Sequence, residues 1–151
     1  PERFHEVYTL CGRRPEGWRV SRATAPREES PDIFILDTMG DLARVYGLGD
    51  VAVVAGSFAP SVGGHNLMEA AAHAVPVVVG PQMWAQQEID RLFADADSGC
   101  VRCDAASLPA TLLDLLRDAG RRKRLGEAAR RTALSNQGSA RASIEVIRRY
   151  L

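Results

Sequence analysis

Residues 51–80 read VAVVAGSFAPSVGGHNLMEAAAHAVPVVVG. Two runs of small and β-branched residues, 51–55 and 77–79, flank a glycine-rich loop and a helix predicted over 66–73. Valine runs without alternating polar residues are typical of strands covered on both faces, as in parallel sheets sandwiched by crossover helices. The stretch therefore predicts part of a Rossmann-like, doubly wound α/β fold with helices on both faces of the sheet.

The alternation of strand and helix patterns continues on both sides of this stretch. The periodicities predict strands over 18–22, 33–36 and 99–103 and helices over 3–12, 41–46, 85–94, 108–116, 121–133 and 140–151. We see no internal repeat or linker composition and predict one domain over residues 1–151. A doubly wound sheet places its first strand centrally, and no strand precedes the opening helix, so we expect the leading strand to be missing from this chain.

Composition narrows the class of protein. Of the 151 residues, 46% are hydrophobic and 25% charged, which excludes disordered, collagenous and coiled-coil proteins. No apolar run approaches the roughly 18 residues of a membrane-spanning helix, and the N-terminus lacks the features of a signal peptide. An odd number of cysteines, three, favours a reducing compartment. We expect a soluble fragment of a longer cytosolic protein.

Charge is balanced overall but unevenly distributed. Residues 1–116 carry 9 basic and 16 acidic side chains, whereas residues 117–151 carry 10 and 3. A solvated helix face explains the basic segment most simply, and an anionic membrane surface is an alternative partner. The run Arg121–Arg124 has no interleaved aromatic residue that could stack on bases, so we expect no nucleic acid partner.

The loop after the 51–55 strand is the first candidate site, because ligands of open parallel sheets lie outside the carboxyl ends of the strands. Gly63 and Gly64 would allow a phosphate to approach the backbone. His65 would either donate to a phosphate or sugar oxygen or pack the loop. Glu69 would accept hydrogen bonds from sugar hydroxyls. Alternatively, Asn66 and Glu69 form a capping box at the start of the helix.

Two further loops end at the same edge of the sheet. In the first, Asp37 or Thr38 would cap the next helix. Alternatively, Gly40, with Met39 beside it, would present backbone groups to a flat base. In the second, Trp84 would pack against the body of the domain or contact a partner domain.

We expect no metal site. The histidines at positions 5, 65 and 73 are scattered along the chain, and Cys100 and Cys103 would point to opposite faces of a strand.

Several motifs in order resemble one known family. PERFxEV at 1–7, DTMGDL at 37–42, GGHNLME at 63–69 and PVxxGP at 76–81 are similar to the C-terminal half of the 3-deoxy-D-manno-octulosonic acid (Kdo) transferases. This resemblance implies the C-terminal domain of a GT-B glycosyltransferase, which moves Kdo with inversion from CMP-Kdo to lipid A precursor in lipopolysaccharide synthesis. It also implies a location at the cytoplasmic face of the bacterial inner membrane.

The resemblance assigns residues by position. The family's Met-Gly-Glu and Asn-x-x-Glu segments, which bind the CMP part of the donor, correspond to Met39, Gly40 and Asp41 and to Asn66, Leu67, Met68 and Glu69. Asp41 departs from the family's glutamate, so a contact made by that side chain would change while a backbone contact of Gly40 would not.

The resemblance also implies what this chain lacks. The catalytic carboxylate and the lipid A precursor site of the family belong to an amino-terminal domain, so we expect no catalytic residue here, no cofactor, and no activity of this chain alone.

Two other functions remain open at this point. Domains of GT-B enzymes that use UDP-sugars also hold the ribose with a glutamate at the equivalent helix, and base preference separates them from a CMP-Kdo enzyme. A non-catalytic nucleotide-binding module is the other alternative.

Overall fold

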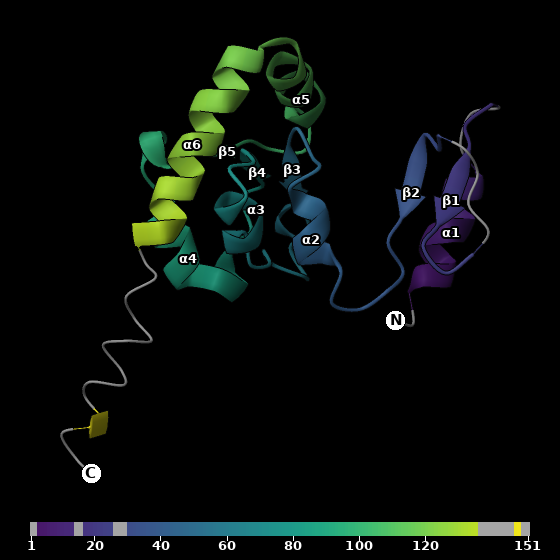
Figure 1. Cartoon of the computed structure of the whole chain (residues 1–151), viewed down its shortest axis with the longest axis horizontal. Helices are drawn as coiled ribbons and strands as arrows, with labels where there is room; N and C mark the ends of the chain where they lie inside the picture. The colour runs from purple at the N-terminus through teal and green to yellow at the C-terminus, as the bar shows by residue number, and fades with distance from the viewer. Residues whose placement is uncertain (1–2, 14–16, 26–29, 136–146, 149–151) are drawn as a thin grey trace. The chain divides into compact units, whose positions relative to one another are not determined.

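The computed structural model describes residues 3–13, 17–25, 30–135 and 147–148 (Figure 1). The chain divides into two compact units, Pro1–Arg44 and Val45–Leu151, which are described separately below. The helix predicted over 140–151 lies outside the described residues, apart from the helical pair 147–148.

The first unit contains a helix and two parallel strands, as the sequence predicts. Helix α1 spans Phe4–Gly12, and strands β1 (Val20–Arg22) and β2 (Ile33–Ile35) pair in register from Val20 opposite Ile33. The guanidinium of Arg22 stacks over the ring of Tyr8 at 5.5 Å, which fixes α1 against β1. Helix α2 (Leu42–Tyr46) follows and runs across the boundary between the units.

The second unit is built on three parallel strands in the order β3-β4-β5 (Figure 1). The strands span Ala52–Val54, Val77–Val79 and Cys100–Arg102. The helices are α3 (Met68–Ala72), α4 (Gln87–Leu92), α5 (Leu108–Arg117) and α6 (Ala119–Ser135), and single 3₁₀ turns lie at η1 (Ala55–Phe58), η2 (Trp84–Gln86) and η3 (Ala96–Ser98). These observations confirm the predicted α/β class with parallel strands.

The core of the second unit surrounds β4. All three residues of β4 are completely buried, so the strand is covered on both faces, which is why its sequence is a run of valines. Val77 and Val79 belong to one apolar cluster with alanines of α3 and α6, and Val78 points to the opposite face. Alanines allow α3 and α6 to approach closely, and the carbonyl oxygen of Ala74 lies against Gly126 of α6, where a Cβ would clash.

The third helix is shorter than predicted. The sequence pattern predicts a helix over 66–73. In the structure, residues 63–67 are irregular and α3 begins at Met68. It ends at Ala72, and Ala74 adopts a left-handed conformation with φ of +58°, which turns the chain toward β4.

Candidate functional site

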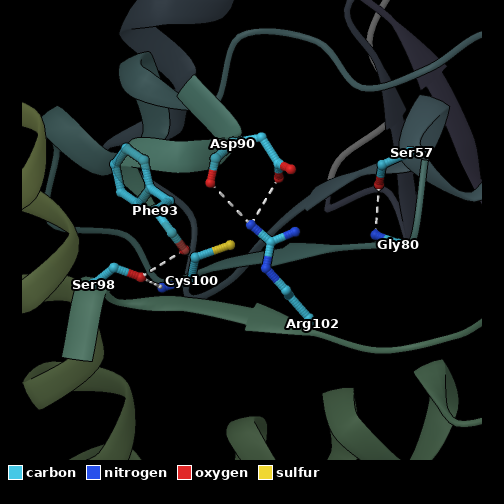
Figure 2. Close-up of polar contacts among 7 residues, drawn as sticks. All are labelled: Ser57, Gly80, Asp90, Phe93, Ser98, Cys100 and Arg102. Atoms are coloured by element: carbon cyan, nitrogen blue, oxygen red, sulfur yellow. Dashed lines mark hydrogen bonds and ion pairs between the residues drawn. The ribbon is translucent and has the colours of Figure 1, made fainter. Parts of the chain in front are cut away.

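Ser57 joins the two loops that leave the carboxyl ends of β3 and β4. Its side chain is completely buried; the hydroxyl donates to the carbonyl oxygen of Val54 at 2.5 Å and accepts from the N–H of Gly80 at 2.6 Å (Figure 2). The carbonyl oxygen of Ser57 accepts from the N–H of Gln82 at 2.9 Å. Ser57 is not among the site residues predicted from the sequence. Nothing in the local sequence around a small polar residue after a strand indicates a hydrogen-bond partner 23 residues away.

The glycines of the 63–69 loop pack against the segment after β4. Gly63 has φ of +72°, and a Cβ at this position would lie 2.9 Å from Cε2 of Trp84. A Cβ on Gly64 would overlap Sδ of the buried Met83. Close packing against neighbouring side chains therefore requires glycine at both positions, and the left-handed conformation is a second requirement at Gly63. From the sequence, we expect these glycines only for the approach of a phosphate.

The backbone of this loop leaves polar groups without a protein partner. The N–H of Gly63 donates to the carbonyl oxygen of Ala59, but the N–H groups of the next four residues, 64–67, have no acceptor among the described residues. The loop is exposed at His65 and Asn66. Successive unpaired N–H groups of this kind are typical of anion-binding loops.

Asn66 and Glu69 do not form the predicted capping box, because the N-cap of α3 is Leu67 and carries no side-chain cap hydrogen bond. The Oδ1 atom of Asn66 accepts from the N–H of Met68 at 2.9 Å, so the side chain of Asn66 does satisfy a backbone donor at the start of α3. The carboxylate of Glu69 is exposed and forms no hydrogen bond or ion pair with any described residue. Burial, and to a lesser degree the nearby Glu69 carboxylate, raises the pKa of Tyr46.

The first unit holds the other three predicted site residues on an exposed turn. Met39 is 77% exposed, and Gly40 has φ of +88° with open space where a Cβ would project. The hydroxyl of Thr38 donates to Oδ2 of Asp41 at 2.7 Å, which closes the turn just before α2. The peptide groups of Met39 and Gly40 are therefore held at the surface by a short side-chain bridge.

Asp37 does not cap α2, so that part of the prediction is wrong. Its buried carboxylate instead accepts hydrogen bonds from the side-chain hydroxyl (2.5 Å) and the N–H (3.0 Å) of Thr24, and from Nε of Arg22 (2.7 Å). The hydrogen bonds from Thr24, together with the Arg22 guanidinium, lower the pKa of Asp37 to about 2. This network fixes the end of β2 from which the Met39–Asp41 turn projects.

Polar contacts also fix α4 to the last residue of β5 and the end of α4 to the turn η3 before β5 (Figure 2). Arg102 donates from Nη2 to Oδ1 of Asp90 at 2.7 Å, and Ser98 donates from its hydroxyl to the carbonyl oxygen of Phe93 at 3.0 Å. Burial raises the pKa of the neighbouring Cys100 thiol to about 11. None of the three cysteines forms a disulfide, and the described residues contain no group of three or more side chains suited to hold a metal ion.

Helix α6 carries most of the basic segment. Its 17 residues include six arginines and lysines and a single glutamate. Arg122 donates from Nη1 to the carbonyl oxygens at the end of α5 and pairs with Asp50 at 3.2 Å. No described helix combines the length and the hydrophobicity that crossing a bilayer requires.

An arginine face of α6 lies beside η3. Arg121, Arg124 and Arg131 line a surface depression of about 530 Å³, together with Asp97 and Glu127, and their guanidinium groups form no ion pair with any described residue.

Two relatives of known activity align with the whole of this chain. The chain is 34% identical over 154 residues to the 3-deoxy-D-manno-octulosonic acid transferase of Bordetella pertussis and 30% identical over 154 residues to that of Haemophilus influenzae. Each alignment covers 100% of this chain but 35% of the relative, so the chain spans about a third of the length of these curated relatives. No family model matches.

A solved structure is also similar. It is the C-terminal CMP-Kdo binding domain of WaaA from Acinetobacter baumannii, with a TM-score of 0.76 and 30% sequence identity. The match covers 87% of this chain and 68% of that chain.

Proposed function

This chain belongs to the 3-deoxy-D-manno-octulosonic acid (Kdo) transferase family, and we propose that it is the domain that binds the CMP-Kdo donor of a glycosyltransferase. The observation that carries the proposal is the set of polar groups that the 63–69 loop leaves unused. Four successive backbone N–H groups and the exposed carboxylate of Glu69 have no partner among the described residues. A nucleotide offers a phosphate for the first and ribose hydroxyls for the second.

The proposed contacts divide the nucleotide among three kinds of group. The N–H groups of residues 64–67 would hold the phosphate, because anions suit a row of unpaired backbone donors. Glu69 would accept hydrogen bonds from the ribose hydroxyls, since a carboxylate placed beside the phosphate itself would be repelled. In the first unit, the family motif assigns Met39 and Gly40, both exposed, to the CMP part of the donor.

Backbone contacts to the base would not depend on the side chain of Asp41, which differs from the glutamate of the family motif. Asp41 replaces the family's glutamate, and its carboxylate is held by the hydroxyl of Thr38. Met39 and Gly40 are exposed in the turn that this bridge closes.

This domain would contribute one half of a transfer reaction. When Kdo leaves the donor, negative charge develops on the phosphate of CMP, and preorganised N–H groups stabilise such charge without reorganisation. We place the general base that activates the acceptor hydroxyl, and the binding site for lipid A precursor, in the part of the relatives that this chain does not match.

Titration with nucleotides tests the proposal. We expect CMP to shift the amide NMR signals of Gly40 and of Gly63–Glu69, with a dissociation constant near 1 mM, which corresponds to roughly −4 kcal/mol. UMP should bind more weakly. An equal response to UMP would favour a UDP-sugar enzyme, and the absence of any response to either nucleotide would contradict nucleotide binding by this chain.

A variant pair sharpens this titration. Glu69→Gln removes the charge that would hold the ribose, and hydrogen bonds to charged groups contribute about 1.5–3 kcal/mol, so CMP should bind about 10- to 100-fold more weakly. The matched control is Glu88→Gln, which removes an exposed carboxylate of α4. Deoxy-CMP should lose affinity against the unchanged chain but little against Glu69→Gln, because the two changes remove the same contact.

A second candidate property is contact with an anionic membrane surface. The three arginines of the α6 face have no ion-pair partner among the described residues, and α5, which packs on α6, exposes Leu113 and Leu116 by about half. Unpaired basic side chains on one helix face are typical of surfaces that bind anionic lipid. We propose that this face brings the parent enzyme to the cytoplasmic leaflet where its lipid acceptor lies.

A further inference from the structure

Trp84 is a large aromatic residue that lies outside the hydrophobic core of the second unit. Its side chain is 52% exposed, and it follows β4 in the turn η2, outside the apolar cluster of the second unit. Its described contacts are with the glycine loop that follows β3. Nε1 of Trp84 donates to the carbonyl oxygen of Pro60 at 3.2 Å, a hydrogen bond between residues 24 positions apart.

The indole also limits the conformation of the loop. The ring atoms Cε2 and Cδ2 of Trp84 lie 2.9 and 3.1 Å from the position of a Cβ on Gly63, so the ring covers the face of the backbone where a side chain would project. Gly63 keeps φ of +72° at this contact. The buried Met83 supports the next residue, Gly64, in the same way.

These contacts lie immediately before the four unpaired N–H groups. Gly63 is the last residue before the four unpaired N–H groups whose own N–H is bonded, and its dihedral angles set the direction of the peptide groups that follow. The indole is bonded at Pro60 and stacked at Gly63, and so holds the loop at two points three residues apart. Ser57 fixes the base of the same loop.

We propose that Trp84 is a positioning residue, which holds the backbone at Gly63 in the conformation that presents the N–H groups of residues 64–67 to the phosphate of the donor. The loop conformation follows from the contacts above, whereas the consequence for affinity rests on the proposed function. Trp84 itself touches no reacting atom in this account. It acts through the backbone of Gly63, and its substitution should loosen the loop without disturbing β4.

Two substitutions separate the two contacts. Trp84→Phe keeps an aromatic ring over Gly63 and removes the hydrogen bond to Pro60, and Trp84→Ala removes both. NMR order parameters of the amides of Gly63–Asn66 report loop rigidity, and rigid backbone has values near 0.85. We expect values below about 0.6 in Trp84→Ala, intermediate values in Trp84→Phe, and unchanged values in Val77–Val79. Trp18→Phe, in the first unit, is the matched control.

The same samples are titrated with CMP. Affinity should fall at least tenfold in Trp84→Ala and less in Trp84→Phe, while the shifts of the Gly40 amide at saturation stay the same. Unchanged order parameters at Gly63–Asn66 in both variants would overturn the proposal whatever the affinities. If the loop loosens as expected but the unchanged chain does not bind CMP, the proposed function fails and the positioning of the loop by Trp84 stands.

Discussion

At the scale of single residues, the same amino acid is required for different reasons at different sites. Gly40 and Gly63 both have positive φ, but Gly40 has open space where a Cβ would project, whereas Gly63 is covered by the indole of Trp84. From the sequence, we expect Gly63 to let a phosphate approach the backbone and Gly40 to present backbone groups to a flat base. The structure shows that Gly40 is a turn residue with an exposed backbone and that Gly63 is a packing residue.

The buried carboxylate of Asp37 leads to a prediction about pH. Hydrogen bonds from Thr24 and the Arg22 ion pair lower its pKa to about 2 in the folded chain, below the ordinary value near 3.8. A group whose pKa is lower in the folded state stabilises the fold above its unfolded pKa and loses that contribution as pH falls through the folded value. The Asp37 contribution is therefore complete above about pH 5 and disappears between about pH 4 and pH 2.

Urea unfolding, followed through the amide signals of β1 and β2, tests this contribution. The unchanged chain should be more stable than Asp37→Asn at pH 6, and the difference should shrink steadily from pH 4 to pH 2. Asp114→Asn, which removes an exposed carboxylate of α5, serves as the control. A difference that stays constant over this pH range would show that the carboxylate of Asp37 contributes no pH-dependent stability.

At the scale of elements, the hydrophobic pattern predicts which segments form strands and helices. It does not predict the tertiary contacts that fix the ends of these elements. The runs at 33–36, 51–55 and 77–79 all form strands within a residue or two of the predicted ends, because burial of β-branched side chains is a local property of the sequence. The predicted start of α3 is two residues too early, because the contacts of Gly63 and Gly64 with the 83–84 segment keep the preceding loop irregular.

The residues of the candidate site also fall into those that the local sequence predicts and those that depend on distant contacts. The spacing of Asn66 and Glu69 is compatible with both a capping box and a ligand contact. In the structure the side chain of Asn66 accepts only from the N–H of Met68, and Glu69 is unpaired among the described residues. The roles of Ser57 and Trp84 depend on partners more than 20 residues away, and no local pattern encodes such contacts.

The contact between α3 and α6 leads to a prediction at this scale. A Cβ on Gly126 would clash with the carbonyl oxygen of Ala74, a backbone atom that cannot rotate away, so Gly126→Ala should destabilise the fold by about 1–3 kcal/mol or more. Gly120→Ala is the matched control on the same helix, because its Cβ would approach neighbouring side-chain atoms no closer than 3.4 Å.

Because of helix propensity, the two substitutions should change the free energy of unfolding in opposite directions. Replacing glycine by alanine within a helix gains up to about 1 kcal/mol where the added methyl group fits, so Gly120→Ala should be neutral or slightly stabilising. Thermal unfolding followed by circular dichroism gives both values. Equal effects of the two substitutions would mean that the close approach of α6 to Ala74 contributes little to stability.

At the scale of the whole molecule, the balance of charge conceals a segregation along the sequence. The chain has no net charge at pH 7, but residues 117–151 carry a net charge of +7 and the remainder carries −7. Within the basic segment, Arg122 is used internally, pairing with Asp50 and bonding the end of α5. Arg121, Arg124 and Arg131 lie at a helical spacing that places them on one face of α6, where the described residues offer no counter-ion within ion-pair distance.

Vesicle binding tests whether this face contacts anionic lipid. The chain should sediment with vesicles that contain anionic phosphatidylglycerol and not with neutral phosphatidylcholine, and binding should weaken as salt rises from about 0.1 to 0.5 M, because surface charges are screened. Each arginine near an anionic surface contributes about 1 kcal/mol, so the double variant Arg121→Gln/Arg124→Gln should bind about 30-fold more weakly. The variant Arg44→Gln/Arg91→Gln removes the same charge from exposed positions outside α6. An equal loss in both variants would mean that net charge governs binding rather than this face, and equal binding to neutral vesicles would exclude an electrostatic contact.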